Sequence, residues 1–174
     1  SDSCPVVDPD QGPGGQAALA FDGVDDYVAI PPFDATGPAM TIAAWIRSSS
    51  FATGDQRFIS KTTGTTTFWS LGINAAALRF HLMTGTSTTT LDGGTLQQNV
   101  WYHAVATYDG AMMRLYLDGV EVGSTAATGP IAAGAAVPVS IGRNPAGSGS
   151  NYLQGAIDDL RVFAHALGAA DVAA

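Results

Sequence analysis

The stretch that decides the fold is Asn99–Gly119, NVWYHAVATYDGAMMRLYLDG. Residues 101–108 are rich in aromatic and β-branched side chains, which favour strands. Asp109-Gly110 then supplies a turn in which glycine tolerates positive φ. Residues 112–117 return as a second strand, and Asp118-Gly119 turns the chain into a third. Because both faces of these strands carry apolar side chains, the pattern predicts three antiparallel strands at the centre of a β-sandwich.

The same signals recur on both sides of this stretch. Short apolar segments alternate with turns built from Asp-Gly pairs, glycines and threonine-rich loops, and further strands are predicted at residues 17–21, 25–30, 40–47, 57–61, 67–73, 77–83, 86–91, 137–142 and 155–163. Residues 164–174 are expected to form one short helix. About a dozen strands without strand-helix-strand alternation predict an all-β, antiparallel two-sheet β-sandwich of the jelly-roll type.

The chain of 174 residues is long enough for one such domain with a sizeable core. Residues 1–15, SDSCPVVDPDQGPGG, mix proline, glycine and aspartate without a usable period. They are predicted to be a linker or tail, and residues 16–174 the domain. We therefore expect the chain to be one module of a larger multidomain protein.

Composition narrows the range of partners. The net charge is -8 and the isoelectric point is near 4.4, so nucleic acid and anionic membrane surfaces, which need a positive field, are not expected partners. Apolar runs stay well below the ~20 residues of a membrane helix, so membrane insertion is not expected. The single cysteine, Cys4, cannot form a disulfide within these residues and is either a free thiol or paired with another chain or with a segment outside this sequence.

Five segments, in this order along the chain, carry a family resemblance: FDGVDDYV (21–28), TIAAW (41–45), WYHAVA (101–106), LYLDG (115–119) and GAIDDLRVF (155–163). Together they resemble the laminin-G-like, concanavalin-A-like jelly-roll domains of secreted and surface proteins. The resemblance covers the chain from about Ala17 onward and implies an extracellular or cell-surface location. Since this architecture hosts lectins, adhesion modules, pentraxins and glycosidases, the function has to be argued from the site.

The sequence lacks the residue patterns that the common hydrolytic mechanisms need. Glycoside hydrolysis normally needs two carboxylates flanking the bond, and the β-glucanases of this fold are similar to one another in a Glu-x-Asp-x-x-Glu strand. This chain has a single glutamate, Glu121, and the pairs Asp25-Asp26 and Asp158-Asp159 would point to opposite faces if they lie on strands. The sequence has neither a Gly-x-Ser-x-Gly elbow nor a His-x-x-x-His zinc motif. We therefore predict a non-catalytic domain.

A glycan site is predicted from aromatic residues beside polar loops. Trp69 and Tyr152 each adjoin such a loop, and an aromatic ring can stack on the apolar face of a sugar. Arg143 and Asn144 can add hydrogen bonds there. We expect any sugar to bind near these four residues and the loop 143–151, rather than on the central strands.

A structural calcium ion is the expected cofactor. Asp158 resembles, in the last strand of concanavalin-A-like glucanases, an aspartate whose side-chain and backbone oxygens bind calcium. Asp22, at the Asp22-Gly23 turn, is the second expected carboxylate, and the Gly23 carbonyl is a further candidate with Asp25 a lesser one. Two carboxylates with turn carbonyls and water supply the six to eight oxygens that calcium prefers. The ion is expected to tie the first strand to the last.

The sequence thus predicts a non-catalytic recognition module that binds a glycan or an extracellular protein, with calcium in support. Two alternatives stay open. One is a pentraxin-like binder that uses calcium directly to hold its ligand. It needs acidic and amide ligands gathered on one loop face, and the sequence does not indicate such a cluster. The other is a structural spacer or adhesion module without a small ligand.

Overall fold

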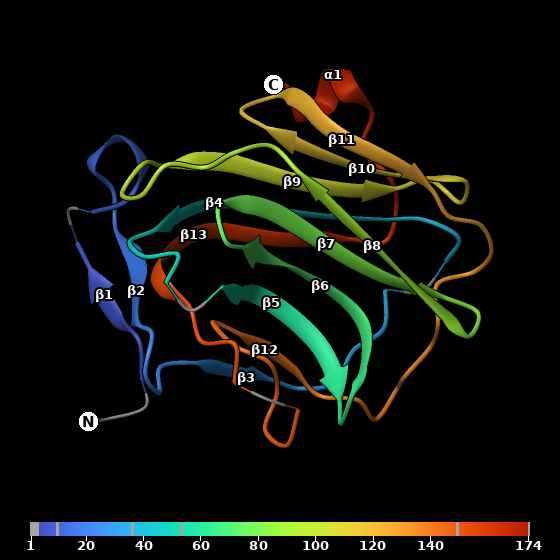
Figure 1. The fold of residues 1–174 in the computed structure, drawn as a ribbon, viewed down its shortest axis with the longest axis horizontal. Coiled ribbons are helices and arrows are strands. Elements are labelled where there is room, and N and C mark those ends of the chain that lie inside the picture. Colours follow the sequence, from blue (N-terminus) through green and yellow to red (C-terminus); the bar gives the residue numbers. More distant parts are fainter. Residues whose placement is uncertain (1–3, 10, 36, 53, 149, 174) are drawn as a thin grey trace.

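The computed structural model describes residues 4–9, 11–35, 37–52, 54–148 and 150–173. Within these ranges, two antiparallel sheets stack face to face, and almost no helix is present (Figure 1). The predicted two-sheet, all-β sandwich is therefore confirmed. Parts of three sequence predictions fall outside the described ranges: residues 1–3 and 10 of the predicted tail, Gly149 of the loop 143–151, and the last residue of the predicted helix.

One sheet has seven strands in the order β1-β2-β13-β4-β9-β10-β11. Their bounds are β1 (Val6–Asp8), β2 (Ala18–Asp22), β13 (Gln154–Phe163), β4 (Met40–Ser48), β9 (Tyr102–Tyr108), β10 (Met112–Leu117) and β11 (Val120–Ala126). The last strand, β13, thus lies between the early strands β2 and β4, which closes the sheet with long-range contacts.

The other sheet has six strands in the order β3-β12-β5-β6-β7-β8. Their bounds are β3 (Val28–Ile30), β12 (Val139–Ile141), β5 (Asp55–Thr63), β6 (Thr66–Asn74), β7 (Ala77–Thr84) and β8 (Ser87–Gly93). Strands β5 to β8 are consecutive hairpins, as expected from their alternating apolar pattern and short turns.

The central strands form as the deciding stretch predicts. Strand β9 pairs with β10, and β10 pairs with β11. At the turn between the last two, Asp118 and Gly119 both have positive φ, 49° and 79°. Two successive left-handed residues match the right-handed twist of the flanking strands, which is why Asp-Gly is favoured at a two-residue hairpin turn.

The core lies between the sheets. Side chains that alternate inward from both sheets are fully buried there, among them Met40, Ile42, Ile46, Phe58, Trp69, Leu71, Phe80, Tyr108 and Leu115. Burying a side chain of this size contributes about 1.5–3 kcal/mol relative to leaving it exposed. The period of two along each strand therefore decides which residues hold the sandwich together.

The first and last elements of the chain both belong to the seven-stranded sheet or contact it. Strand β1 pairs with β2 at its edge, so ordered structure begins well before the predicted start near Gln16. A 3-10 turn follows at Pro13–Gly15. At the other end, helix α1 (Ala169–Val172) places Val172 against Ala43 and Val105, outside the sheet (Figure 1). No helix in the described part of the chain is long and apolar enough to span a membrane.

Candidate functional site

The two carboxylates predicted to share calcium lie apart. Asp22 is opposite Gln154 in the β2–β13 ladder, and Asp158 lies four residues further along β13. At ~3.3 Å per residue this is roughly 13 Å along the strand, whereas two oxygens on one calcium ion are at most about 5 Å apart. The register therefore does not bring Asp22 and Asp158 to one ion, and Asp158 instead faces the outer side of the sheet near Trp45.

Asp22 is joined by two other carboxylates in the turn that follows it. Oxygens of Asp22, Asp25 and Asp26 lie within 4.8 Å of one another. The turn is closed by Asp22 Oδ1, which accepts the backbone N–H groups of Val24 and Asp25, while Asp26 Oδ2 accepts the N–H of Asp22. Asp25 and Asp26 lie in this turn rather than on a strand, so the opposite-face expectation does not hold for them. We call Asp22–Asp26 the acidic turn.

The electrostatics of the acidic turn differ between its members. The N–H of Val24 holds the pKa of Asp22 below its ordinary value. Burial, followed by the negative charges of Asp22 and Asp25, raises the pKa of Asp26. Asp26 is 6% exposed, so part of this negative charge is held away from bulk water. Three hard oxygen donors of this kind suit a cation such as calcium.

Arg143 is held between two tyrosines directly beside the acidic turn. Its guanidinium carbon lies 4.8 Å from the ring centroid of Tyr27 and 4.9 Å from that of Tyr152. Nη1 donates to the hydroxyl of Tyr152 at 2.7 Å, and Nε donates to the carbonyl of Asn144 at 2.6 Å. Tyr27 directly follows Asp26, so two loops bring these groups to one end of the sandwich. We call Tyr27, Arg143, Tyr152 and the acidic turn the loop edge.

Gly142 sets the position of the backbone directly before Arg143. It has a φ of +85°, and a Cβ at this position would lie 2.4 Å from the ring of Phe21 and 3.3 Å from the carbonyl oxygen of Asp26. Only glycine lets the loop before Arg143 approach β2 and the acidic turn so closely. This close approach is what joins the two halves of the loop edge.

Two of the predicted sugar-binding residues, Trp69 and Asn144, are buried and stabilise the fold instead of facing a ligand. Trp69 is 1% exposed and its ring lies 5.6 Å from that of Phe33, inside the core, so it does not present a face to a ligand. Asn144 is 5% exposed. Its Oδ1 accepts the Ser60 hydroxyl, and its Nδ2 donates to the Ser148 carbonyl and to Asn151 Oδ1. Asn144 therefore holds down the loop 143–151, whereas Arg143 and Tyr152 are half-buried and reach its surface.

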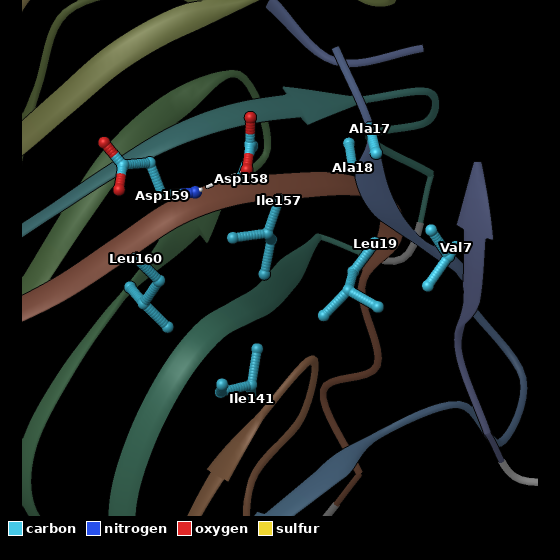
Figure 2. A pocket seen from close by; sticks show the side chains of 9 residues that line it. All are labelled: Val7, Ala17, Ala18, Leu19, Ile141, Ile157, Asp158, Asp159 and Leu160. Atoms are coloured by element: carbon cyan, nitrogen blue, oxygen red, sulfur yellow. Dashed lines mark hydrogen bonds between the residues drawn. The ribbon is translucent and has the colours of Figure 1, made fainter. Parts of the chain in front are cut away.

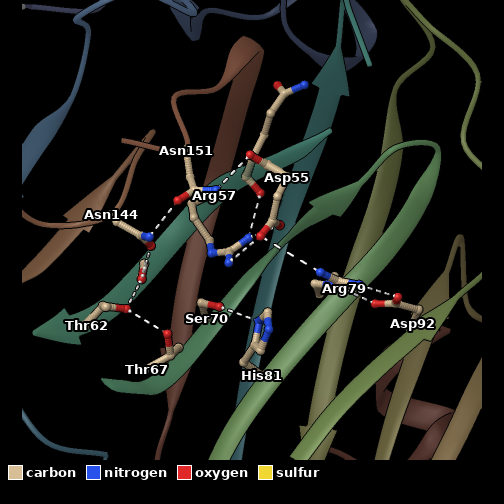
Figure 3. Close-up of polar contacts among 12 residues, drawn as sticks. Asp55, Arg57, Thr62, Thr67, Ser70, Arg79, His81, Asp92, Asn144 and Asn151 are labelled. Atoms are coloured by element: carbon tan, nitrogen blue, oxygen red, sulfur yellow. Dashed lines mark hydrogen bonds and ion pairs between the residues drawn. The ribbon is translucent and has the colours of Figure 1, made fainter. Parts of the chain in front are cut away.

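The loop 143–151 rests on a polar network along the outer face of the six-stranded sheet (Figure 3). Asn151 Nδ2 donates to the carbonyl of Asp55, whose carboxylate binds Arg57 and lies 3.9 Å from Arg79. Arg79 in turn binds Asp92 through two hydrogen bonds of 2.6 and 2.7 Å. These charged groups therefore pair with one another across four strands, β5 to β8, although the buried Nε of Arg57 has no hydrogen-bond partner among the described residues.

His81 occupies the middle of this face. Its Nδ1 lies 3.2 Å from the hydroxyl of the fully buried Ser70. Burial, together with the positive charges of Arg57 and Arg79, lowers the pKa of His81 to about 4. At neutral pH the imidazole is therefore uncharged, and His81 has a structural position within this polar face.

An apolar cavity of about 200 Å³ lies beside the irregular part of β13 (Figure 2). The pairing of β13 with β4 shifts register between Asp158 and Arg161, and the small residues Ala17 and Ala18 line the cavity at the start of β2. Figure 2 shows Ile157 and Leu160 pointing toward Ile141, while the carboxylates of Asp158 and Asp159 point to the other side of β13. The cavity is therefore a gap in the packing, and the two aspartates belong to the outer face of the sheet.

The sequence did not single out two residues of the loop edge, Asp26 as a metal ligand and Tyr27 as a partner of Arg143. Tyr27 is the one that joins the two loops. Its position directly after two aspartates, before a short strand, is the one local signal for it. That it meets Arg143 depends on the pairing of β3 with β12, which joins segments more than 100 residues apart.

Solved structures share this fold. A heptameric SAP-like pentraxin from Limulus polyphemus superposes with a TM-score of 0.67 at 20% identity, over 90% of this chain and 79% of the pentraxin. Domains LG4-5 of the mouse laminin α1 chain give 0.68 at 17% identity, over 87% of this chain and 44% of the laminin fragment. Domain 4 of AbnA, an extracellular GH43 arabinanase from Geobacillus stearothermophilus solved with arabinotriose, gives 0.69 at 17% identity, over 97% and 79%. At these identities the likeness concerns the fold.

No curated protein matches the sequence. A laminin-G-type family model, described as the concanavalin A-like lectin/glucanases superfamily, matches residues 22–173. This range contains both sheets except β1 and most of β2, together with the complete loop edge. The chain therefore belongs to the concanavalin A-like lectin/glucanases superfamily, as its sequence segments predicted.

Proposed function

We propose that this chain is a non-catalytic recognition module that binds a hydroxylated ligand, foremost a glycan, at the loop edge. The observation that carries the proposal is Arg143, whose guanidinium is fixed between Tyr27 and Tyr152 beside three carboxylates. Aromatic rings suit the apolar face of a sugar, and the remaining guanidinium N–H groups suit its hydroxyls. The arabinotriose in the complex of the arabinanase domain supports a sugar as ligand.

The loop edge is organised before a ligand arrives. Arg143 is bonded to Tyr152 and Asn144, and Asn144 is bonded to Ser60 in β5. Binding therefore does not need to order a long, flexible side chain, which would cost about 0.5–1.5 kcal/mol. This supports recognition by Arg143 and Tyr152, with Asn144 as the residue that positions them.

We infer that calcium binds at the acidic turn. Asp22, Asp25 and Asp26 provide carboxylate oxygens, and the adjacent Gly23 carbonyl is a further candidate. Such a donor set fits the ion, and the ion would fix the turn that carries Tyr27. The pentraxin-like alternative, in which calcium itself contacts the ligand, is favoured by the same observation, because the acidic turn lies at the ligand-facing loops.

An extracellular or cell-surface location and a place in a larger chain belong to the same proposal. The likeness to a laminin domain pair and to one domain of an extracellular enzyme supports both. A surface protein is the second partner class that such a module would take. The lack of catalysis rests on the single glutamate, Glu121, which is on β11 and away from the loop edge.

Thermal unfolding tests the calcium part. At a hundredfold excess over Kd, an ion that binds only the folded state stabilises it by about 2.7 kcal/mol, which for a domain of this size raises Tm by roughly 5–10 °C. We expect this rise to be reversed by chelator and lost in Asp22→Ala. The matched control, Asp158→Ala, should keep the full response. A Tm that ignores both calcium and chelator would contradict the site.

A glycan array with and without chelator tests the recognition part. We expect the chain to bind at least one neutral glycan class, and Arg143→Ala and Tyr152→Ala each to weaken that binding about tenfold or more, as hot-spot residues do. Arg114→Ala is the matched control, because Arg114 of β10 forms a partly exposed ion pair with Asp109, and neither residue belongs to the loop edge. Binding that survives both loop-edge substitutions would refute this placement.

A further inference from the structure

A row of outward side chains crosses the middle of the seven-stranded sheet. Trp45 of β4 is opposite Asp158 of β13 on one side and His103 of β9 on the other. The rings of Trp45 and His103 lie 5.3 Å apart at an interplanar angle of 39°. Asp118 follows beyond His103 and accepts its backbone N–H at 2.8 Å. The row thus reads carboxylate, indole, imidazole, carboxylate across about 14 Å, at ~4.8 Å per strand.

The two terminal segments border this row. On one side, the carbonyl of Gln11 accepts the Trp101 indole N–H at 2.8 Å, and the Gln11 side chain binds Arg47. These bonds hold the 3-10 turn at Pro13–Gly15 against the sheet. On the other side, Val172 of α1 is buried against Ala43 and Tyr116. The outward face is therefore covered on both sides of the row but half-open at Trp45 itself.

Three hollows meet at Trp45. One of about 370 Å³ lies toward Pro13, Gln16 and Asp158, and one of about 280 Å³ lies over Ala43 and Val105 beside α1. A third of about 250 Å³ lies toward Asp118 and Ala173. All three are lined by Trp45, so they border one another around its ring. We call this group of hollows the Trp45 trough.

The polar groups of the trough both donate and accept. Asp118, Asp158 and Asp159 supply acceptors, while Gln16 and Arg161 supply donors, and Arg161 is already paired with Asp159 at 2.8 Å. A hydroxyl group needs both kinds of partner at once, whereas a cation needs only acceptors and an anion only donors. The half-open indole at the centre suits the apolar face of a sugar ring.

We propose that the Trp45 trough is a second ligand site, on the outer face of the seven-stranded sheet, that binds a short neutral oligosaccharide lying across the strands. Trp45 stacks on a central sugar ring, and Asp158 and Asp118 accept hydroxyl hydrogens at its two ends. The site is separate from the loop edge. It also lies on the central strands, where the sequence did not predict binding.

The test is isothermal titration of the full chain with six neutral linear hexasaccharides: cello-, xylo-, laminari-, malto-, manno- and arabinohexaose. The titrations use the unchanged chain, Trp45→Ala and Arg143→Ala. For at least one hexasaccharide, we expect Trp45→Ala to weaken binding about tenfold or more and Arg143→Ala to leave that binding event in place. Asp158→Asn, which keeps the size of the side chain, should weaken the same event, and circular dichroism of each variant shows that its fold is kept.

The outcomes separate the two sites. Binding that is lost in Arg143→Ala and retained in Trp45→Ala overturns the trough and leaves the loop edge standing, while the reverse supports the trough alone. Binding of none of the six sugars at millimolar concentration overturns the trough. So does tight binding of pentalysine that Trp45→Ala removes and salt weakens, because it would identify a cation site. Sugar binding at the trough should not depend on salt.

Discussion

The outer faces of the two sheets differ in how far their side chains are in contact with one another. On the six-stranded sheet, polar side chains bind one another, so Ser60, Ser70 and Arg57 are at most 4% exposed although they point away from the core. On the seven-stranded sheet, an indole is left half-open between two terminal segments. Satisfied polar groups give rigidity and hold a loop in place, whereas an open aromatic ring keeps binding energy available for a ligand.

The largest expected difference in stability is between alanine variants of the buried Trp69 and the half-open Trp45. Trp69→Ala should destabilise the fold by about 3–5 kcal/mol, since it removes a buried core ring. Trp45→Ala should cost far less, because its ring is already partly in water. Unfolding in urea measures both. Similar losses of unfolding free energy for the two variants would mean that Trp45 is packed like a core residue and that its ring is not available to a ligand.

The next effect concerns Asn144, which joins the loop edge to the six-stranded sheet. Asn144→Ala leaves the buried hydroxyl of Ser60 without this acceptor, and we expect a loss of about 1–3 kcal/mol. Arg161→Ala breaks an ion pair of two side chains that are 60% and 50% exposed, which is worth about 0–1 kcal/mol. The same urea titration compares the two variants, and an equal cost for both would contradict the idea that buried side-chain hydrogen bonds hold the loop to the six-stranded sheet.

The smallest of these effects is the pH dependence from His81. Its pKa is about 4 in the folded chain, below the ordinary value of 6.5, because burial and two arginines disfavour its charged form. The unfolded chain therefore binds the proton first, so stability is complete above pH 6.5 and falls as the pH drops from 6.5 toward 4. The slope is at most about 1.4 kcal/mol per pH unit.

His81→Asn should flatten this part of the profile, measured as Tm against pH. His103, whose pKa is also lowered by burial, contributes in the same direction. The charged groups that face His81 are Arg57, Arg79, Asp55 and Asp92. A profile that is unchanged by His81→Asn would remove this histidine from the account of the polar face.

Most strands could be predicted because period and turn chemistry are local. The Asp118-Gly119 turn and the alternation along β4 are read directly from the sequence, and so are eleven other strands to within a few residues. The sequence also contains a signal for the inward position of Trp69, because Trp69, Leu71 and Ile73 follow one another at every second residue and therefore share one face of the strand. Because a polar loop is nearby, Trp69 was predicted to be exposed, but the alternation of side chains along β6 places it in the core. Strand β1 was missed because its three residues lie among proline, glycine and aspartate.

The sites could be predicted only in part, because they depend on pairing over long distances. Arg143 and Tyr152 are near each other in sequence, but Tyr27 joins them only through the pairing of β3 with β12. The separation of Asp22 from Asp158 follows from the register of β2 against β13. The opening at Trp45 depends on where both chain ends lie, which no local pattern specifies.

Amide chemical-shift mapping tests whether recognition takes place at the loop edge. The isotope-labelled chain is titrated first with calcium and then with the strongest glycan from the array. We predict that calcium shifts the amides of residues 22–27, and that the glycan then shifts those of Tyr27, Arg143 and Tyr152. Glycan-induced shifts that leave these three amides unmoved would contradict the account.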